Sequence, residues 1–95
     1  MSAPRVLVLG GCGFIGRHLV EYIVKNKLAS KVKVADKTPP ALAGMNAEQN
    51  EIFKGDLVVF QQANLSRETF VKKAFEDGPY QIVFNLAGNS SYEDL

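Results

Sequence analysis

The sequence has few of the residues on which disulfide-rich and metal-binding proteins depend. Its 95 residues include one cysteine, one histidine and no tryptophan. One cysteine excludes an internal disulfide, and Cys12 and His18 alone cannot form a metal cluster. We therefore assign no metal site. We expect the protein to work in a reducing compartment, the cytoplasm.

An excess of charge of either sign is also missing. The 11 lysines and arginines are balanced by 10 aspartates and glutamates, which leaves a formal net charge of +1. This balance gives no electrostatic reason to expect nucleic acid as a partner. No stretch approaches the ~20 apolar residues of a membrane span, and residues 1–5 do not resemble a secretory signal. We expect residues 1–95 to form one globular domain without membrane contact.

Short apolar runs alternate with amphipathic segments in the first third of the chain. Residues 6–9 form a continuous apolar run that stops at a glycine pair, as expected for a strand buried on both faces. From residue 14 to residue 25 the pattern is that of an amphipathic helix. The expected buried stripe of this helix consists of Ile15, Leu19 and Ile23, widened by Tyr22 and Val24. Residues 31–35 predict a second strand, which ends at Asp36.

The remaining elements are predicted by the same patterns. A loop with one helical turn near residues 41–45 follows the second strand, and residues 51–53 are ambiguous. A third strand is expected over residues 57–62. Ser66 is expected to cap a helix that runs to about Glu76. The expected buried residues of this helix are Phe70, Val71, Ala74 and Phe75. Residues 81–85 predict a fourth strand.

Strands that alternate with helices predict an α/β fold with a parallel sheet and right-handed crossovers. The expected architecture is the N-terminal half of a three-layer Rossmann-type fold, with about four strands in the order 3-2-1-4. In that order residues 81–85 lie at an edge of the sheet. Because this strand is apolar and carries no charge or proline, we expect the chain to self-associate through it.

A glycine-rich loop joins the first strand to the first helix. Gly10, Gly13 and Gly16 have the spacing G-x-x-G-x-x-G, one residue longer in its first gap than the standard dinucleotide fingerprint. Such glycines permit a tight turn, close approach of a diphosphate and close packing of the helix. The main-chain N–H groups of Phe14 and Ile15 are the expected phosphate donors. The alternative is a tight turn without a ligand.

Asp36 stands at the end of the second strand, about 20 residues after the loop, where the fingerprint places an acidic residue. A carboxylate there can accept hydrogen bonds from the adenosine ribose and repel a 2′-phosphate. NAD is therefore the expected cofactor and NADP the less favoured one. Lys37 weakens this preference, since a cation beside the ribose tolerates a phosphate. The alternative for Asp36 is a solvated charge at the end of a strand.

These motifs resemble the N-terminal part of extended short-chain dehydrogenases/reductases, the NAD-dependent epimerase/dehydratase family. Residues 62–65 are similar to a family segment that lies against the adenine, although the family usually has aspartate where Asn64 stands. Residues 85–88 are similar to a family turn that borders the cofactor. The resemblance thus implies that Asn64, Leu65, Leu86, Ala87 and Gly88 border the adenosine. The alternatives are a turn role for Asn64 and a core role for Leu65.

The resemblance also shows which family motif is missing from these 95 residues. The family's catalytic Tyr-x-x-x-Lys does not occur among the 95 residues, and we assign no catalytic residue. We expect an NAD-binding part of an oxidoreductase or isomerase that is inactive alone. The alternative function is a non-catalytic module that senses a nucleotide or serves in assembly.

Overall fold

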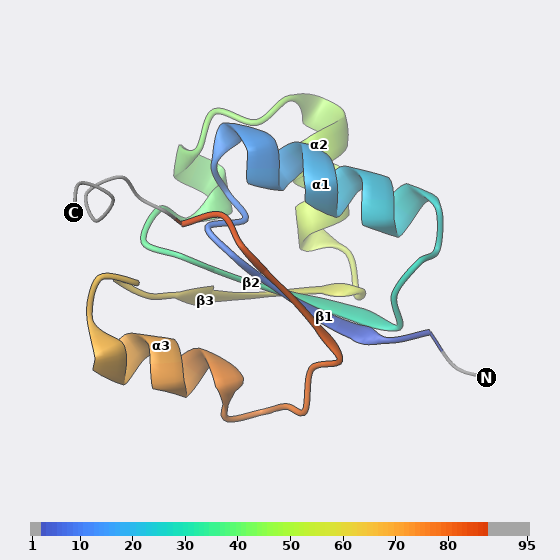
Figure 1. Ribbon diagram of the computed structural model, residues 1–95. Helices are drawn as coiled ribbons and strands as arrows, with labels where there is room; N and C mark the ends of the chain where they lie inside the picture. Colours follow the sequence, from blue (N-terminus) through green and yellow to red (C-terminus); the bar gives the residue numbers. More distant parts are fainter. Residues whose placement is uncertain (1–2, 88–95) are drawn as a thin grey trace.

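The computed structural model describes residues 3–87, which form one parallel sheet flanked by helices (Figure 1). The four strands are β1 (Arg5–Leu9), β2 (Lys31–Asp36), β3 (Val58–Gln62) and β4 (Ile82–Asn85). Their order is β3-β2-β1-β4, and every neighbouring pair is parallel. The predicted fold class and strand order are confirmed.

The helices lie on both faces of the sheet and make it the middle of three layers. Helices α1 (Phe14–Lys25) and α2 (Ala47–Lys54) cover one face, and α3 (Glu68–Phe75) lies against the other (Figure 1). This division follows from right-handed crossovers, because the chain moves one way from β1 to β3 and returns in the opposite direction to β4. Within residues 3–87 no helix is long and apolar enough to cross a bilayer.

Apolar side chains from the central strands fill two clusters, one on each face. The larger cluster lies under α1 and α2, and its strand residues include Val6, Val8, Val32 and Val34. The smaller cluster faces α3 and consists of Leu7, Leu9, Ala35 and Ala74, with partly buried neighbours. Successive residues of a strand point to opposite faces, so β1 is apolar at each of its four buried positions, Val6 to Leu9.

Helix α1 packs on part of the predicted stripe. Ile23 is buried, and Leu19 and Val24 pack against the larger cluster, whereas Ile15 is 68% exposed and Tyr22 is 60% exposed. The prediction was wrong for these two residues because the helix turns Gly16 and Val20 toward the sheet, and its closest contact passes through a glycine. A Cβ on Gly16 would lie 2.5 Å from the carbonyl oxygen of Gly10. A hydrophobicity pattern gives such a position no weight.

Helix α2 follows the expected loop and includes the ambiguous residues 51–53. A short 3-10 segment, Pro40–Leu42, overlaps the helical turn expected near residues 41–45. Asn46 Oδ1 accepts a hydrogen bond from Gln49 N at 2.8 Å, and Gln49 Oε1 accepts one from Asn46 N at 3.2 Å. This reciprocal capping box stabilises the first turn of α2. The helix was missed because Gln49, one of its two buried residues, is polar; the other is Phe53.

Helix α3 begins later than predicted, and Ser66 does not cap it. The N-cap residue is Arg67, without a side-chain capping bond, and Ser66 Oγ donates instead to Asn64 Oδ1 at 2.7 Å. Ala74 is buried as expected, but Phe75 is 43% exposed. One helix covers this face of the described sheet, which leaves the outer side of α3 in solvent.

A buried lysine in β2 anchors the segment between α3 and β4. The side chain of Lys33 is 5% exposed, and its Nζ lies 2.9 Å from Asp77 Oδ1. Tyr80 donates its hydroxyl hydrogen to the same oxygen at 2.6 Å. The hydrogen bonds from Tyr80 and Lys33 lower the pKa of Asp77, and burial raises the pKa of Tyr80 to about 12. Asp77 thus holds the entry to β4 against the middle of the sheet.

We predict that Asp77→Ala destabilises the protein more than Lys33→Met. Loss of Asp77 leaves a buried ammonium without its partner, at a cost of about 1–3 kcal/mol. Loss of the ammonium leaves Asp77, whose side chain is 53% exposed and can be hydrated. Urea unfolding of both variants measures the difference.

The pH dependence of this effect has a definite sign. The folded-state pKa of Asp77 is lowered, so its contribution is complete above its unfolded pKa and shrinks as the pH falls below about 4. The stability gap between wild type and Asp77→Ala should therefore narrow in acid. Equal losses in both variants at neutral pH would contradict this account of Asp77 and Lys33.

Candidate functional site

A cavity of about 500 Å³ opens at the carboxyl ends of the four strands. In open α/β sheets this edge is where ligands bind, next to the point where successive connections run in opposite directions. Here that point lies between β1 and β4. The lining residues follow all four strands and are Gly10, Gly13, Asp36, Lys37, Ala63, Asn64, Leu65, Ser66, Leu86 and Ala87.

The glycine loop forms one wall of the cavity, and its first glycine is required by the backbone. Gly10 has a φ of +84°, a conformation that residues with a Cβ rarely adopt. A Cβ there would also lie 2.7 Å from Ala87 N. Gly10 N donates to Ala35 O at 2.7 Å, which joins the loop to the end of β2. The loop is therefore fixed against both neighbouring strands.

Gly13 is the N-cap of α1, and space is open around it. Its φ is −69° and no side chain caps the helix. A Cβ on Gly13 would meet only Gly10 O, at 3.4 Å. The first turn of α1 also contains no acidic residue. An anion can therefore approach the first-turn N–H groups of α1 without meeting a capping side chain or an acidic residue of that turn.

Phe14 and Ile15 begin α1 at this wall. Their side chains are 74% and 68% exposed, so the expected burial of Ile15 is wrong. Gly16 lies beneath them, buried against the turn. The structure thus places Gly13 in the cavity wall and the main chain of residues 14–16 beside it, while the two apolar side chains are exposed.

Asp36 binds the glycine loop directly through its carboxylate. Oδ2 accepts a hydrogen bond from Cys12 N, and Oδ1 accepts one from Thr38 N, both at 3.0 Å. A carboxylate has about four lone-pair positions, so each oxygen retains capacity for a ligand hydroxyl. Asp36 is therefore not a purely solvated charge, because both of its carboxylate oxygens accept main-chain hydrogen bonds.

The segment after β3 forms the opposite wall. Asn64 Oδ1 accepts hydrogen bonds from Ser66 N at 3.1 Å and from Ser66 Oγ at 2.7 Å. Asn64 therefore has the turn role that was one of its two alternatives, and it also lines the cavity. Leu65 likewise has two roles, because it lines the cavity and packs against the smaller core cluster.

Two lining residues were not among the predicted ones. Ala63 is 2% exposed, and its N–H donates to Asp36 O at 2.9 Å. Ser66 was predicted as a helix cap. Both belong to or adjoin the segment that resembled the family's adenine-side motif, and that proximity was the available signal. Gln62 Nε2 donates to Lys37 O at 3.0 Å and joins this segment to the loop after β2.

The turn after β4 closes the cavity. Leu86 N donates to Leu9 O at 2.8 Å, which extends the pairing of β1 with β4 up to the lining residues Leu86 and Ala87. Gly88, the last of the predicted cofactor residues, lies outside the described residues. The structure thus brings eight of the twelve predicted residues to the cavity wall; Phe14, Ile15 and Gly16 lie beside it.

Cys12 and His18 lie near the loop without the geometry of reactive groups. Cys12 is buried in the larger core cluster. Burial and the charge of Asp36 raise the pKa of its thiol to about 12, although Arg17 opposes this shift. The thiol is therefore protonated at neutral pH. His18 is exposed, and its Nδ1 lies 2.8 Å from Phe14 O.

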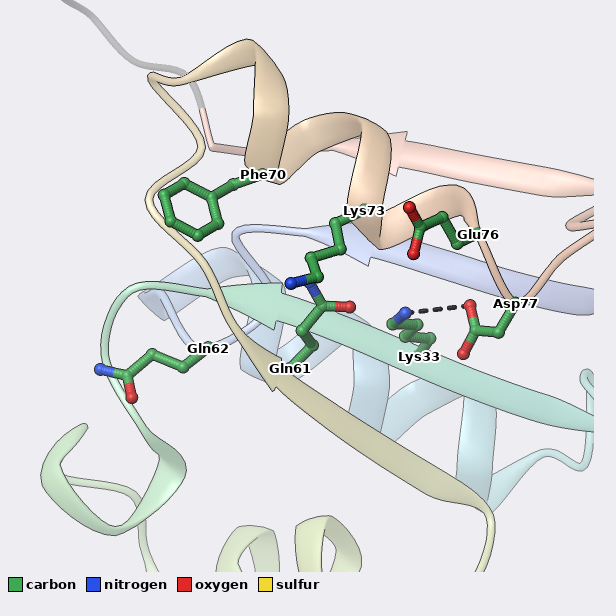
Figure 2. Close-up of a pocket in the computed structure, with 7 residues that line it drawn as sticks. All are labelled: Lys33, Gln61, Gln62, Phe70, Lys73, Glu76 and Asp77. Carbon is green, nitrogen blue, oxygen red and sulfur yellow. Dashed lines mark hydrogen bonds and ion pairs between the residues drawn. The ribbon is translucent and has the colours of Figure 1, made fainter.

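A second cavity, of about 350 Å³, lies between α3 and the sheet (Figure 2). It is lined by Lys33, Gln61, Gln62, Phe70, Lys73, Glu76 and Asp77. Figure 2 shows Lys33 joined to Asp77 across one end, with Glu76 beside them. The lining carries two ammonium groups, Lys33 and Lys73, and two carboxylates, Glu76 and Asp77, and Lys33 is already paired with Asp77. This cavity therefore offers a diphosphate no excess of positive charge, whereas the glycine loop offers the N-terminus of α1.

The chain is similar in sequence and in fold to parts of known enzymes. The chain is 32% identical over 88 residues to 3beta-hydroxysteroid-dehydrogenase/decarboxylase isoform 1 of Arabidopsis thaliana, a match that covers 90% of this chain and 19% of that protein. The crystal structure of dTDP-glucose 4,6-dehydratase from Bacillus anthracis in complex with NAD has a TM-score of 0.73 at 22% identity. That match covers 95% of this chain and 28% of the dehydratase.

A third relative has a solved structure and a higher sequence identity to this chain than the dehydratase has. UDP-glucose 4-epimerase of Thermus thermophilus in complex with NAD has a TM-score of 0.64 and 32% identity, over 90% of this chain and 24% of the epimerase. The chain therefore spans less than a third of each of these relatives. Residues 6–94 match the family model itself. With this match over nearly its whole length, the chain belongs to the NAD dependent epimerase/dehydratase family.

Proposed function

We propose that this chain binds the ADP half of NAD in the cavity at the carboxyl edge of the sheet. One observation carries the proposal: an uncapped helix N-terminus, a carboxylate and an apolar wall face the same space of about 500 Å³. Phosphate, ribose and adenine need these three surfaces, in this order along the nucleotide. The NAD complex of the Thermus thermophilus epimerase, 32% identical, supports the same cofactor.

Each part of the nucleotide has a proposed partner. The diphosphate lies on the N–H groups of Phe14 and Ile15, at the positive end of the α1 dipole. The ribose hydroxyls donate to Asp36, whose carboxylate is already oriented by Cys12 N and Thr38 N. The adenosine lies against Asn64, Leu65, Leu86, Ala87 and Gly88, with Lys37 at its rim.

Catalysis is proposed for the longer relatives and not for these residues. Under this proposal, a longer protein of the family is an oxidoreductase or isomerase that uses NAD as a hydride carrier. The 95 residues contain no Tyr-x-x-x-Lys. We therefore propose binding without hydride transfer. A cytoplasmic location belongs to the same proposal, because the one cysteine is a buried free thiol.

Gly13→Ala tests the site without disturbing the fold. The backbone of Gly13 suits any residue, and a Cβ has room, so we expect a stability loss of about 1 kcal/mol or less. The methyl group stands where the diphosphate approaches, and we expect NAD and ADP affinity to fall by at least about tenfold. Isothermal titration calorimetry and urea unfolding give the two quantities.

Gly16→Ala is the matched control, because its Cβ would meet Gly10 O at 2.5 Å. This variant should lose stability and binding together. Wild-type protein that releases no heat with NAD, NADP or ADP would favour a scaffold role and end the proposal. NADH formed from NAD and secondary alcohols by the same preparation would refute the absence of catalysis.

Asp36→Asn tests the preference for NAD over NADP. The amide removes the negative charge that repels a 2′-phosphate and that accepts the ribose hydroxyls. We expect NAD affinity to fall about tenfold and the ratio of NADP to NAD affinity to rise. Asp56→Asn, an exposed aspartate before β3, is the charge-matched control. An unchanged ratio in Asp36→Asn would show that another residue sets the preference.

We also propose that two copies of the chain associate through β4. Among residues 3–87, β4 pairs with β1 on one side and with no strand on the other. Ile82 and Val83 are each 41% exposed and Leu86 is 39% exposed. An apolar strand edge without a charge or proline is a template for pairing with another chain.

Sedimentation velocity over a wide concentration range tests this association. The wild-type sedimentation coefficient should rise with concentration, while Val83→Lys should remain monomeric, because the lysine places a charge on the edge strand. A wild-type coefficient that stays at the monomer value over the whole range would exclude pairing through β4.

A further inference from the structure

Arg17, in the first turn of α1, binds the backbone of two loops at once. Its Nη2 donates to Cys12 O at 2.9 Å, and its Nε donates to Gly13 O at 3.2 Å. The same guanidinium donates to Ala43 O at 2.8 Å and to Gly44 O at 3.3 Å. One side chain thus holds carbonyl groups of the glycine loop and of the loop before α2.

The bonds to the glycine loop reinforce the direction of its N–H groups. In a planar trans peptide the C=O and the following N–H point in opposite directions. The carbonyl of Gly13 shares its peptide with the N–H of Phe14 and accepts both the main-chain N–H of Arg17, at 2.9 Å, and its Nε. The guanidinium thus adds a second bond to the helical bond that already directs the Phe14 N–H to the other side. Asp36 fixes the neighbouring Cys12 N–H at 3.0 Å. The loop is therefore braced from both sides.

The second pair of bonds connects this loop to the segment after β2. Gly44 has a φ of +73°, so the chain turns sharply there and presents two successive carbonyl groups to the guanidinium. This segment starts at Lys37 and Thr38, next to the carboxylate of Asp36. Arg17 thereby ties the phosphate side of the cavity to its ribose side. It does not itself line the cavity.

We propose that Arg17 is a positioning residue whose side chain supports the alignment of the Phe14 N–H for the diphosphate and holds the two loops at a fixed separation. The planar fork of a guanidinium, with five N–H donors, can serve several carbonyl groups at once, whereas an ammonium acts as a point charge. The expected effect of Arg17 on ligand affinity rests on the proposed NAD site. The bracing of the two loops by Arg17 rests only on its hydrogen bonds to their carbonyl groups.

The binding test compares ADP with adenosine in wild type, Arg17→Met and Arg17→Lys by calorimetry. We expect Arg17→Met to lose about tenfold in ADP affinity and much less in adenosine affinity, since the glycine loop that loses these side-chain bonds faces the phosphates. Arg17→Lys keeps the charge but should not restore ADP binding. Unchanged ADP affinity in Arg17→Met, or full restoration by lysine, overturns the proposal.

Amide hydrogen exchange of the ligand-free protein supplies a readout that needs no cofactor. In Arg17→Met and Arg17→Lys we expect faster exchange in residues 10–14 and 43–46 together, with the amides of β1 and β2 unchanged. Lys54→Met, which removes one exposed positive charge at the end of α2, is the control and should behave as wild type. Unchanged exchange in both loops overturns the bracing role.

The two measurements separate the failure of this inference from that of the NAD site. If wild-type protein binds no ADP, the proposed site fails, while the exchange of the two loops still decides what Arg17 does. If Arg17→Met does not fold, the lysine variant carries both comparisons, because it retains the charge and the aliphatic stem. A lysine variant identical to wild type in both measurements overturns the inference.

Discussion

The structure of the cavity depends on the close backbone contacts of two glycines, Gly10 and Gly16, in the loop between β1 and α1. A side-chain carbon on Gly16 would lie 2.5 Å from Gly10 O, and one on Gly10 would lie 2.7 Å from Ala87 N. Two segments that are far apart in the sequence, residues 10–16 and residues 86–87, meet here at backbone distance. Because they meet so closely, the N-terminus of α1 opens at the edge of the sheet beside the ends of β1 and β4. The positions of these two walls of the cavity follow from this contact.

Polar bonds then give the cavity its shape before any ligand arrives. Asp36 accepts the N–H of Cys12, Ala63 donates to Asp36 O, and Gln62 donates to Lys37 O. These bonds connect the loops after β1, β2 and β3 in sequence across the edge of the sheet. A site held in this way loses little conformational freedom when a ligand binds, which is the general benefit of preorganisation.

The two faces of the sheet are stabilised by different means. Under α1 and α2 the core is a continuous layer of valine, isoleucine and phenylalanine. On the α3 face the buried cluster is small, and Lys33 extends into it as a charged group paired with Asp77. The second face therefore depends on one electrostatic contact near the start of β4, the strand that completes the cavity.

The sequence by itself determined the order of the four strands, the presence of α1 and α3, the parallel sheet and most of the cavity wall. Glycine spacing, a carboxylate after the second strand and continuous apolar runs are local signals, and each limits the backbone whatever surrounds it. The same signals failed where a residue's role depends on a distant partner. Ile15 lies in solvent because α1 approaches through Gly16. Gln49 is buried in α2, where its amide donates to Glu21 of α1. Ser66 binds Asn64 and does not cap a helix. Only the tertiary structure decided these positions, because hydrogen bonds and close contacts between segments override helical periodicity when the segments pack.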